Sequence, residues 1–253
     1  GGVPRYTDPD FRRASVVLMR KLFEASPDLY AVTLGPPDGG VAVDPRDLER
    51  YGEPGDTREQ KASNYVWDYH VFLARELQKT HPGKFLIYMP GGGAKEVPTN
   101  RRADDPDNLI LGFSQTYSAN RVLAFADRQV REDRARWLAA YRPRGLSPVW
   151  DYFLYYRRAS HPRYPVFFTE SLQREMREMR SYSDGKFIEI NLATQSSGAQ
   201  GAAGARIGEP ALTHLMVCWQ NRLFWDPDAG RAAFLDEYHR LYFGPAAAAM
   251  QAF

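Results

Sequence analysis

Three acidic residues of this sequence stand where catalytic groups of an α/β protein are expected, in or directly after short apolar segments. Asp38 follows the first such segment, Asp151 lies in an aromatic one, and Glu189 lies in the last. Active-site carboxyl groups of barrel enzymes lie at the C-terminal ends of strands. Two of them can cleave a glycosidic bond: one donates a proton to the leaving oxygen, and the other attacks or activates water. These three residues are the candidate catalytic groups.

Each candidate also has a structural interpretation. Asp38 stands in a Pro-Asp-Gly sequence, which is a turn signal in its own right because Asp bonds its local backbone. Asp151 could pair with an arginine from a neighbouring strand, since an unpartnered buried carboxyl has a raised pKa. Glu189 is costly in a buried strand unless it points into a polar cavity or forms an ion pair. Glu170 is expected at a helix start, where it satisfies free amides.

Aromatic and polar side chains near these carboxylates are candidates for binding a sugar. A pyranose ring offers a C–H face that packs on aromatic planes. The candidate aromatic platform is formed by Trp150, Tyr152 and Tyr155, and the candidates for contacting hydroxyl groups are Gln115, Tyr117 and His161. The competing interpretation places at least two of the aromatic side chains in the core. Arginines 101, 102 and 157 are candidates for clamping a uronate carboxylate.

Two further histidines and the one cysteine complete the set of reactive side chains. His70 stands beside Trp67 on a helical face and is expected to be structural, whereas His214 at a helix start is a candidate site residue. Cys218 lies in an apolar run and is expected to be a buried, inert thiol. One cysteine excludes a disulfide within the chain and a zinc cluster built from thiols. We expect neither a metal nor an organic cofactor.

Short apolar runs alternate with helical patterns along the chain. We expect strands near residues 30–34, 85–89, 109–113, 148–153 and 186–191, and helices over 11–25, 65–77, 122–138, 171–180, 212–225 and 229–243. A long polar stretch to about Ser63 follows the first strand. The alternation predicts a parallel sheet with both faces buried. Five strands of a doubly wound sheet and five-eighths of a barrel both fit it. No dinucleotide or phosphate-loop motif follows any strand.

Three stretches carry a resemblance to a known family. They are Thr33 to Gly40, Val149 to Tyr152 with Tyr155-Tyr156, and a tail from Asn221 to Pro227 followed by Asp236-Glu237-Tyr238 and Tyr242-Phe243-Gly244. Over nearly its whole length the chain resembles the bacterial DUF4838 family. That family looks like a branch of the barrel glycosidases, near the α-glucuronidases and the family 20 hexosaminidases.

The resemblance implies an α/β fold of the (β/α)8 TIM-barrel type. Residues 1–253 would supply its C-terminal portion, about strands 4 to 8 with closing helices, as one partial domain. The N-terminal strands would be missing, which leaves unpaired edges at the first and last strands of the chain. In related barrel glycosidases the acid commonly follows the fourth strand, and Asp38 is the residue at that place here. Those relatives often carry Glu or an Asp-Glu pair, so a shorter acid in a differently shaped site is implied.

Composition argues against several other classes of protein. The net charge is +2, and the arginine pairs are short and scattered, so nucleic-acid binding is not expected. No run approaches the roughly 18 apolar residues of a membrane span, so no membrane partner is expected. No signal peptide opens these residues, and secretion or a periplasmic location is expected of the full-length parent. The oligomeric state is not predicted.

The expected partner is a carbohydrate. The sequence favours a glycoside hydrolase acting on an oligo- or polysaccharide, with uronic-acid-containing chains among the candidates. Two alternatives stay open at this point. One is a carbohydrate-binding barrel without catalytic activity, and the other is a doubly wound domain with an unrelated role, which would carry helices on both faces of a flat sheet.

Overall fold

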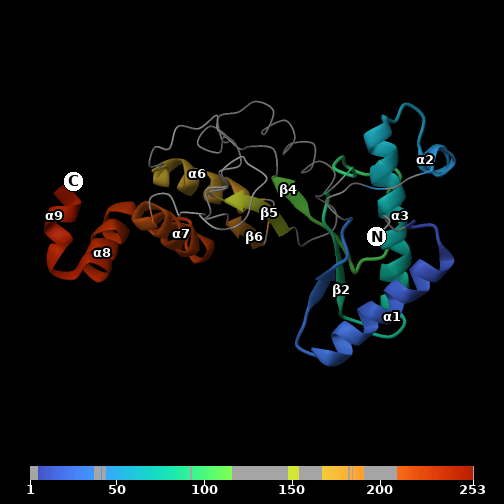
Figure 1. Cartoon of the computed structure of the whole chain (residues 1–253), viewed down its shortest axis with the longest axis horizontal. Helices are drawn as coiled ribbons and strands as arrows, with labels where there is room; N and C mark the ends of the chain where they lie inside the picture. Colours follow the sequence, from blue (N-terminus) through green and yellow to red (C-terminus); the bar gives the residue numbers. More distant parts are fainter. Residues whose placement is uncertain are drawn as a thin grey trace, which may run out of the picture. The chain divides into compact units, whose positions relative to one another are not determined.

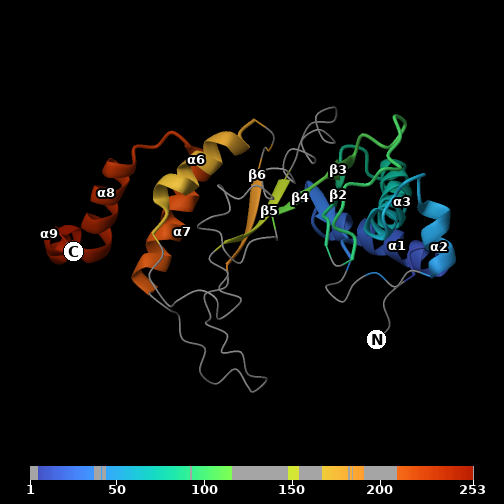
Figure 2. The same cartoon turned by 90° about the horizontal axis from the view of Figure 1, so that it is seen from above.

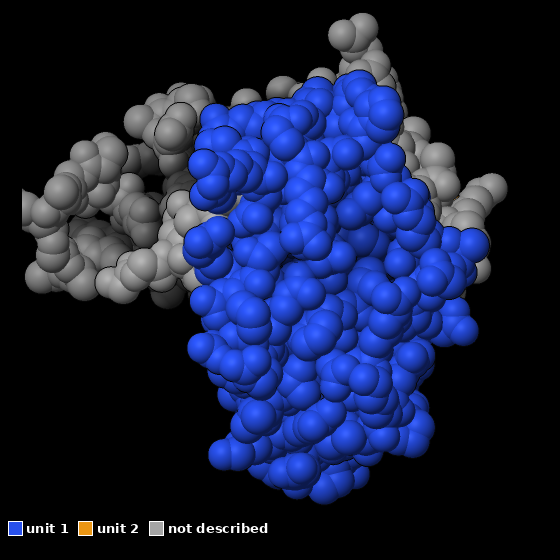
Figure 3. Space-filling model, turned by 90° about the vertical axis from the view of Figure 1, so that its right-hand side faces the viewer, with its two compact units in different colours: residues 1–114, 134–150 blue, residues 115–133, 151–253 orange. Residues whose placement is uncertain are grey.

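The computed structural model of the chain describes residues 5–36, 41, 44–91, 93–115, 148–153, 167–181, 183, 185–190 and 210–252. The chain divides into two compact units, Gly1–Ser114 with Arg134–Trp150 and Gln115–Asp133 with Asp151–Phe253. Figure 3 shows one face of the first unit as a closely packed surface. Each unit is built around buried apolar side chains of its own, such as Leu86 in the first and Met216 in the second.

A three-stranded parallel sheet forms the centre of the first unit. It consists of β1 (Ala31–Thr33), β2 (Phe85–Tyr88) and β3 (Leu109–Leu111), in that order. β2 lies between the other two and pairs in parallel with both. Burial alternates along β1 and β2, where Val32, Leu86 and Tyr88 are buried and Thr33 is exposed, while β3 is buried throughout. The predicted burial of both faces therefore holds for β3 alone, because α1 and α3 cover one face of the sheet. The positions predicted for these strands and their parallel direction are confirmed.

Helices α1 (Pro9–Ala25) and α3 (Arg58–Gln78) lie on one face of this sheet, as Figures 1 and 2 show. Asp8 caps α1, because its carboxylate accepts hydrogen bonds from the backbone amides of Asp10 and Phe11. Each helix buries an apolar stripe, with Met19 and Leu73 fully buried. Two helices on one face of a parallel sheet are found both in a barrel wall and in one half of a doubly wound sheet.

The polar stretch before α3 contains more helix than the sequence predicted. A short helix, α2 (Pro45–Tyr51), begins where the Asp44 carboxylate accepts a hydrogen bond from Arg46 N at 2.9 Å. α3 begins at Arg58 rather than beyond Ser63, because Thr57 and Gln60 form a reciprocal capping box. The sequence analysis described this stretch only as polar and assigned no helix to it. Helices were predicted from apolar periodicity, and neither α2 nor the polar first turn of α3 has that periodicity.

A second sheet contains β4 (Phe113–Gln115), β5 (Pro148–Phe153) and β6 (Gly185–Ile190), in that order. β5 and β6 match the predicted fourth and fifth strands, whereas β4 was not predicted as a separate strand. It follows β3 after a single residue, Gly112, which the sequence reading included in one continuous run. The pattern of apolar runs alone does not show where one strand ends and the next begins.

Four helices and a short 3₁₀ turn complete the described part of the second unit. They are α6 (Thr169–Met179), α7 (Pro210–Trp225), α8 (Arg231–Phe243), η1 (Gly244–Ala246) and α9 (Ala247–Ala252). α6 and α7 pack together through buried side chains, and the indole of Trp219 donates to the Thr169 carbonyl oxygen at 2.9 Å. The helices predicted near 171–180, 212–225 and 229–243 are confirmed. The helix predicted over 122–138 lies outside the described residues.

Within the described ranges, none of the helices combines the length and the apolar character that crossing a bilayer requires.

Candidate active site

The C-terminal ends of β1, β2 and β3 lie at one edge of the parallel sheet, the edge at which ligands bind in α/β proteins. One glycine, Gly112, allows the chain to pass closely there. A Cβ atom on Gly112 would lie 2.9 Å from the Met89 side chain and 3.2 Å from the Tyr88 carbonyl oxygen. A Cβ atom on Gly35 would lie 3.5 Å from the Met89 carbonyl oxygen. The segment leaving β3 is therefore packed tightly against the end of β2, whereas the segment leaving β1 is in ordinary contact with it.

One face of α3 holds the segments that connect these strands. Ser63 Oγ accepts a hydrogen bond from Glu96 N at 3.1 Å, beyond the end of β2. Trp67 Nε1 donates to the Asp105 carboxylate at 3.1 Å, ahead of β3. His70 follows three residues later, and residues three and four apart share one face of a helix. α3 is thus the element that positions the loops at this edge of the sheet.

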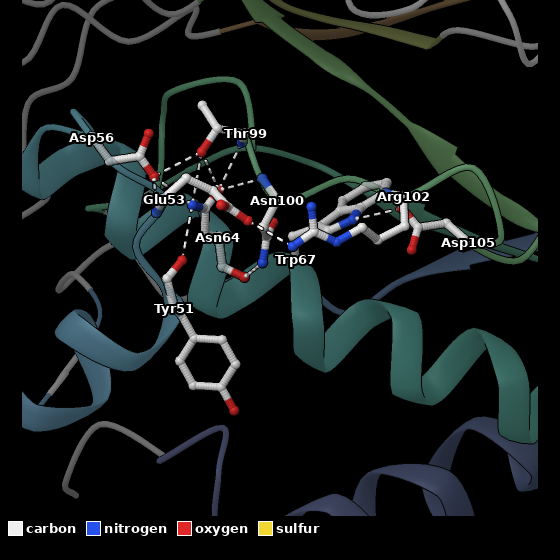
Figure 4. A network of polar contacts seen from close by, with 9 residues as sticks. All are labelled: Tyr51, Glu53, Asp56, Asn64, Trp67, Thr99, Asn100, Arg102 and Asp105. Atoms are coloured by element: carbon white, nitrogen blue, oxygen red, sulfur yellow. Dashed lines mark hydrogen bonds and ion pairs between the residues drawn. The ribbon is translucent and has the colours of Figure 1, made fainter.

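Asn64, fully buried in the same helix, is the centre of a polar network (Figure 4). Its side-chain oxygen accepts hydrogen bonds from Thr99 N at 2.7 Å and Asn100 N at 3.3 Å. Its side-chain nitrogen lies 2.9 Å from the Tyr51 carbonyl oxygen and 2.8 Å from the Asp56 carboxylate. The Thr99 hydroxyl donates to the same carboxylate at 2.7 Å. The network ties the segment after β2 to α3 and to the turn before it.

A second part of the network contains a buried carboxylate. Asp105 accepts hydrogen bonds from Arg102 N at 2.9 Å and from the Trp67 indole. Two N–H donors offset the cost of burying its charge. The Arg102 guanidinium reaches outward to the Glu53 carboxylate at 2.6 Å (Figure 4). Each acidic group of the network already accepts hydrogen bonds from protein donors. These residues therefore serve chiefly to hold the loops at the sheet edge in place.

Two buried ionisable side chains lie where α3 meets β2. The rings of His70 and Tyr88 meet edge to face, with centroids 5.0 Å apart. Burial lowers the pKa of His70 to about 4, although the Val66 and Leu34 backbone carbonyls partly raise it. Burial also raises the pKa of Tyr88 above its usual range. Both side chains are therefore neutral at neutral pH. His70 stabilises the fold fully above about pH 6.5, and this stability is lost as the pH falls towards 4.

The three predicted carboxylates fall in different parts of the chain. Asp38 lies outside the described residues. Asp151 is the fourth residue of β5, and Glu189 is the fifth residue of β6. β5 and β6 are neighbours in their sheet, so these two positions lie on adjacent strands of one unit. Both acidic residues stand within strands and not in the loops that follow them.

Of the predicted sugar-binding residues, three lie in strands. Trp150 and Tyr152 are in β5, where Trp150 is half-buried, and Gln115 ends β4. The other three, Tyr117, Tyr155 and His161, lie outside the described residues. Arg101 and Arg102 lie at the sheet edge of the first unit, where Arg102 pairs with Glu53. The structure therefore places Trp150 and Tyr152 on the same strand as Asp151.

The cysteine prediction was wrong about burial. Cys218 is partly exposed on α7, with Sγ 3.8 Å and 3.7 Å from the two ring nitrogens of His214. His214 lies one turn earlier and is hydrogen bonded to the Tyr238 hydroxyl at 2.9 Å. Burial raises the pKa of the thiol, and the nearly equal distances do not aim it at either nitrogen. The pair therefore lacks the features of an activated thiolate.

Metal-ligating side chains do not gather in the part of the chain that the structure describes: no three His, Cys, Asp or Glu residues there could hold one ion. Comparisons of the chain with protein-family models, with curated proteins and with solved structures find no match. The resemblance to the barrel glycosidases thus stays a prediction. The function has to be inferred from the placement of residues on the strands.

Proposed function

We propose that this chain is part of a glycoside hydrolase that cleaves an oligo- or polysaccharide, uronic-acid-containing chains included, by a two-carboxylate mechanism. The observation that supports the proposal most is the position of Asp151 and Glu189 on the adjacent strands β5 and β6. Adjacent strands lie about 4.8 Å apart. The carboxyl groups of glycosidases are separated by about 5–5.5 Å in retaining enzymes and about 6.5–9.5 Å in inverting ones.

Asp151 and Glu189 both lie within strands, where a charged side chain needs a partner or a polar site. An ionised side chain in an apolar strand destabilises the fold unless it is paired or faces a polar site. The two acidic positions on neighbouring strands support one shared site. Trp150 and Tyr152 remain the proposed aromatic planes for a sugar ring.

The proposed fold is a barrel of the (β/α)8 type. The parallel order β1-β2-β3, with α1 and α3 on one face, supports it. In such barrels catalytic groups come from the ends of several strands. The proposal assigns proton donation to Asp38 and the role of base or nucleophile to Asp151 or Glu189. Gln115, Tyr117, Tyr155 and His161 are proposed to contact the substrate, and neither a metal nor an organic cofactor takes part.

Replacing Asp38 with Asn in the full-length protein tests this assignment. We expect the wild type to release sugar from a panel of neutral and uronate-containing oligosaccharides. The Asp38→Asn variant should release it about 100-fold more slowly, because an amide cannot donate the proton that the leaving oxygen needs. The measurement is reducing-sugar release, with oligosaccharide binding measured in parallel by calorimetry.

The parallel measurement of oligosaccharide binding distinguishes a loss of catalysis from a loss of substrate binding. Binding by both proteins with release by the wild type alone supports the assigned role of Asp38. Binding without release by either would mean that the chain belongs to a carbohydrate-binding barrel and that the catalytic assignments are wrong. Equal sugar release by the wild type and the variant would show that Asp38 is not the proton donor.

A further inference from the structure

The two faces of strand β6 differ in burial. Along its first four residues, Lys186 and Ile188 are partly buried, whereas Gly185 and Phe187 are exposed. Successive side chains of a β-strand point to opposite faces of the sheet. The alternation is therefore that of a strand with one covered face and one open face.

An ion pair identifies the covered face. The Lys186 side chain is fully buried, and its Nζ lies 3.6 Å from the Glu175 carboxylate of α6. α6 thus lies on the face of β6 to which positions 186 and 188 belong. Positions 187 and 189 belong to the opposite face, because they alternate with these two.

Phe187 is exposed on this opposite face. Its exposed fraction is 59%, although it stands in the middle of a strand. Covering the ring would remove apolar surface from water, which is favourable. Glu189, one of the proposed catalytic acids, follows two residues later on the same face, about 6.7 Å further along the strand.

The residue types on this face favour a small amphipathic ligand over a protein partner. Its three positions in β6 carry a glycine, the Phe187 ring and an acidic residue, in that order. A protein interface needs a core of several adjacent apolar side chains. A single aromatic ring two positions from a carboxylate suits a molecule with one apolar face and polar edges.

We propose that Phe187 is the platform on which a sugar ring of the substrate packs, beside position 189. This rests on the proposed function, which makes the substrate a carbohydrate and Glu189 a catalytic acid. A pyranose ring has a face of C–H groups that packs on an aromatic plane. Phenylalanine has no donor or acceptor, so it holds the sugar by this contact alone and leaves the hydroxyl groups to other side chains.

Equilibrium binding to the full-length protein tests the platform. Glu189→Gln is the background for every variant, so that turnover does not consume the neutral and uronate-containing oligosaccharides used as ligands. Adding Phe187→Ala should raise Kd about tenfold, because the apolar contact with the sugar is lost. Adding Phe187→Trp keeps an aromatic plane and should leave Kd within about threefold of the background. Calorimetry measures Kd.

Phe167→Ala is the matched control, because Phe167 is an exposed phenylalanine of the same unit outside the strands, and Kd should not change. Equal Kd values for the background and Phe187→Ala would overturn the platform, whether or not the wild type cleaves the sugar. Binding of none of the oligosaccharides would overturn it too. If binding depends on Phe187 but the wild type cleaves nothing, the platform stands and the hydrolase proposal fails.

Discussion

Replacing Asp151 with Asn or Glu189 with Gln is expected to lower kcat for sugar release by at least about 100-fold, and for one of the two by about 10,000-fold. Each amide keeps the size of its side chain but can neither accept a proton nor attack the anomeric carbon. The larger loss identifies the base or nucleophile, because no other group can take over that role. The measurement is kcat on the oligosaccharide that the wild type cleaves fastest.

A control variant and rescue by azide make this experiment more specific. Glu170→Gln makes the same chemical change in the exposed first turn of α6, as predicted for this residue, and should leave kcat unchanged. If the essential carboxylate is a nucleophile, azide should restore turnover of its amide variant and give a glycosyl azide of inverted anomeric configuration. If kcat falls less than threefold in both the Asp151 and the Glu189 variant, neither residue takes part in catalysis.

Replacing Asn64 with Leu is expected to lower the free energy of unfolding by about 3 kcal/mol. The side chain is fully buried and serves the Thr99 and Asn100 amides and the Tyr51 carbonyl. Leu is similar in volume and leaves all three groups without this partner, at a cost of about 1 kcal/mol each. Urea unfolding, with the slope m compared between variants, measures the loss.

Asn108 is the control for burial of an asparagine. It is also buried, and it donates only to the Ala74 and Lys84 carbonyl oxygens. Its own side-chain oxygen has no partner among the residues described, so Asn108→Leu removes that cost as well. We expect a loss of about 1 kcal/mol. If the Asn64 variant loses no more than the Asn108 variant, the network in Figure 4 does not brace the loops as described.

The strands and most of the helices could be predicted because their signal is local. β2, β5 and β6 are short apolar runs between turn residues, and α6 buries residues at helical spacing, Leu172, Met176 and Met179. α2 was missed because its signal is a cap at Asp44 followed by Pro45, with hardly any apolar face behind it. Closure of a barrel depends on pairings between distant strands and stays a prediction.

The polar network and the His70 site could not be predicted, since their partners are far apart in the sequence. Asn64 meets Thr99 and Asn100 some 35 residues later, and no spacing rule connects them. One signal was present: an Asn and a His in a helix otherwise rich in aromatic and apolar residues. A polar residue on such a face usually has a specific partner, although its identity comes only from the fold.

Cleavage in ¹⁸O-labelled water tests the central claim most directly. The full-length protein is incubated with the uronate-containing and neutral oligosaccharides, and the masses of the products are measured by mass spectrometry. Hydrolysis places one oxygen from water on the anomeric carbon at each new reducing end. We predict one ¹⁸O atom per bond cleaved, and labelled product formed at least about 100-fold more slowly by the Asp151 and Glu189 amide variants. Products without ¹⁸O, such as the unsaturated ends left by elimination, or no cleavage of any bound oligosaccharide, would contradict the account.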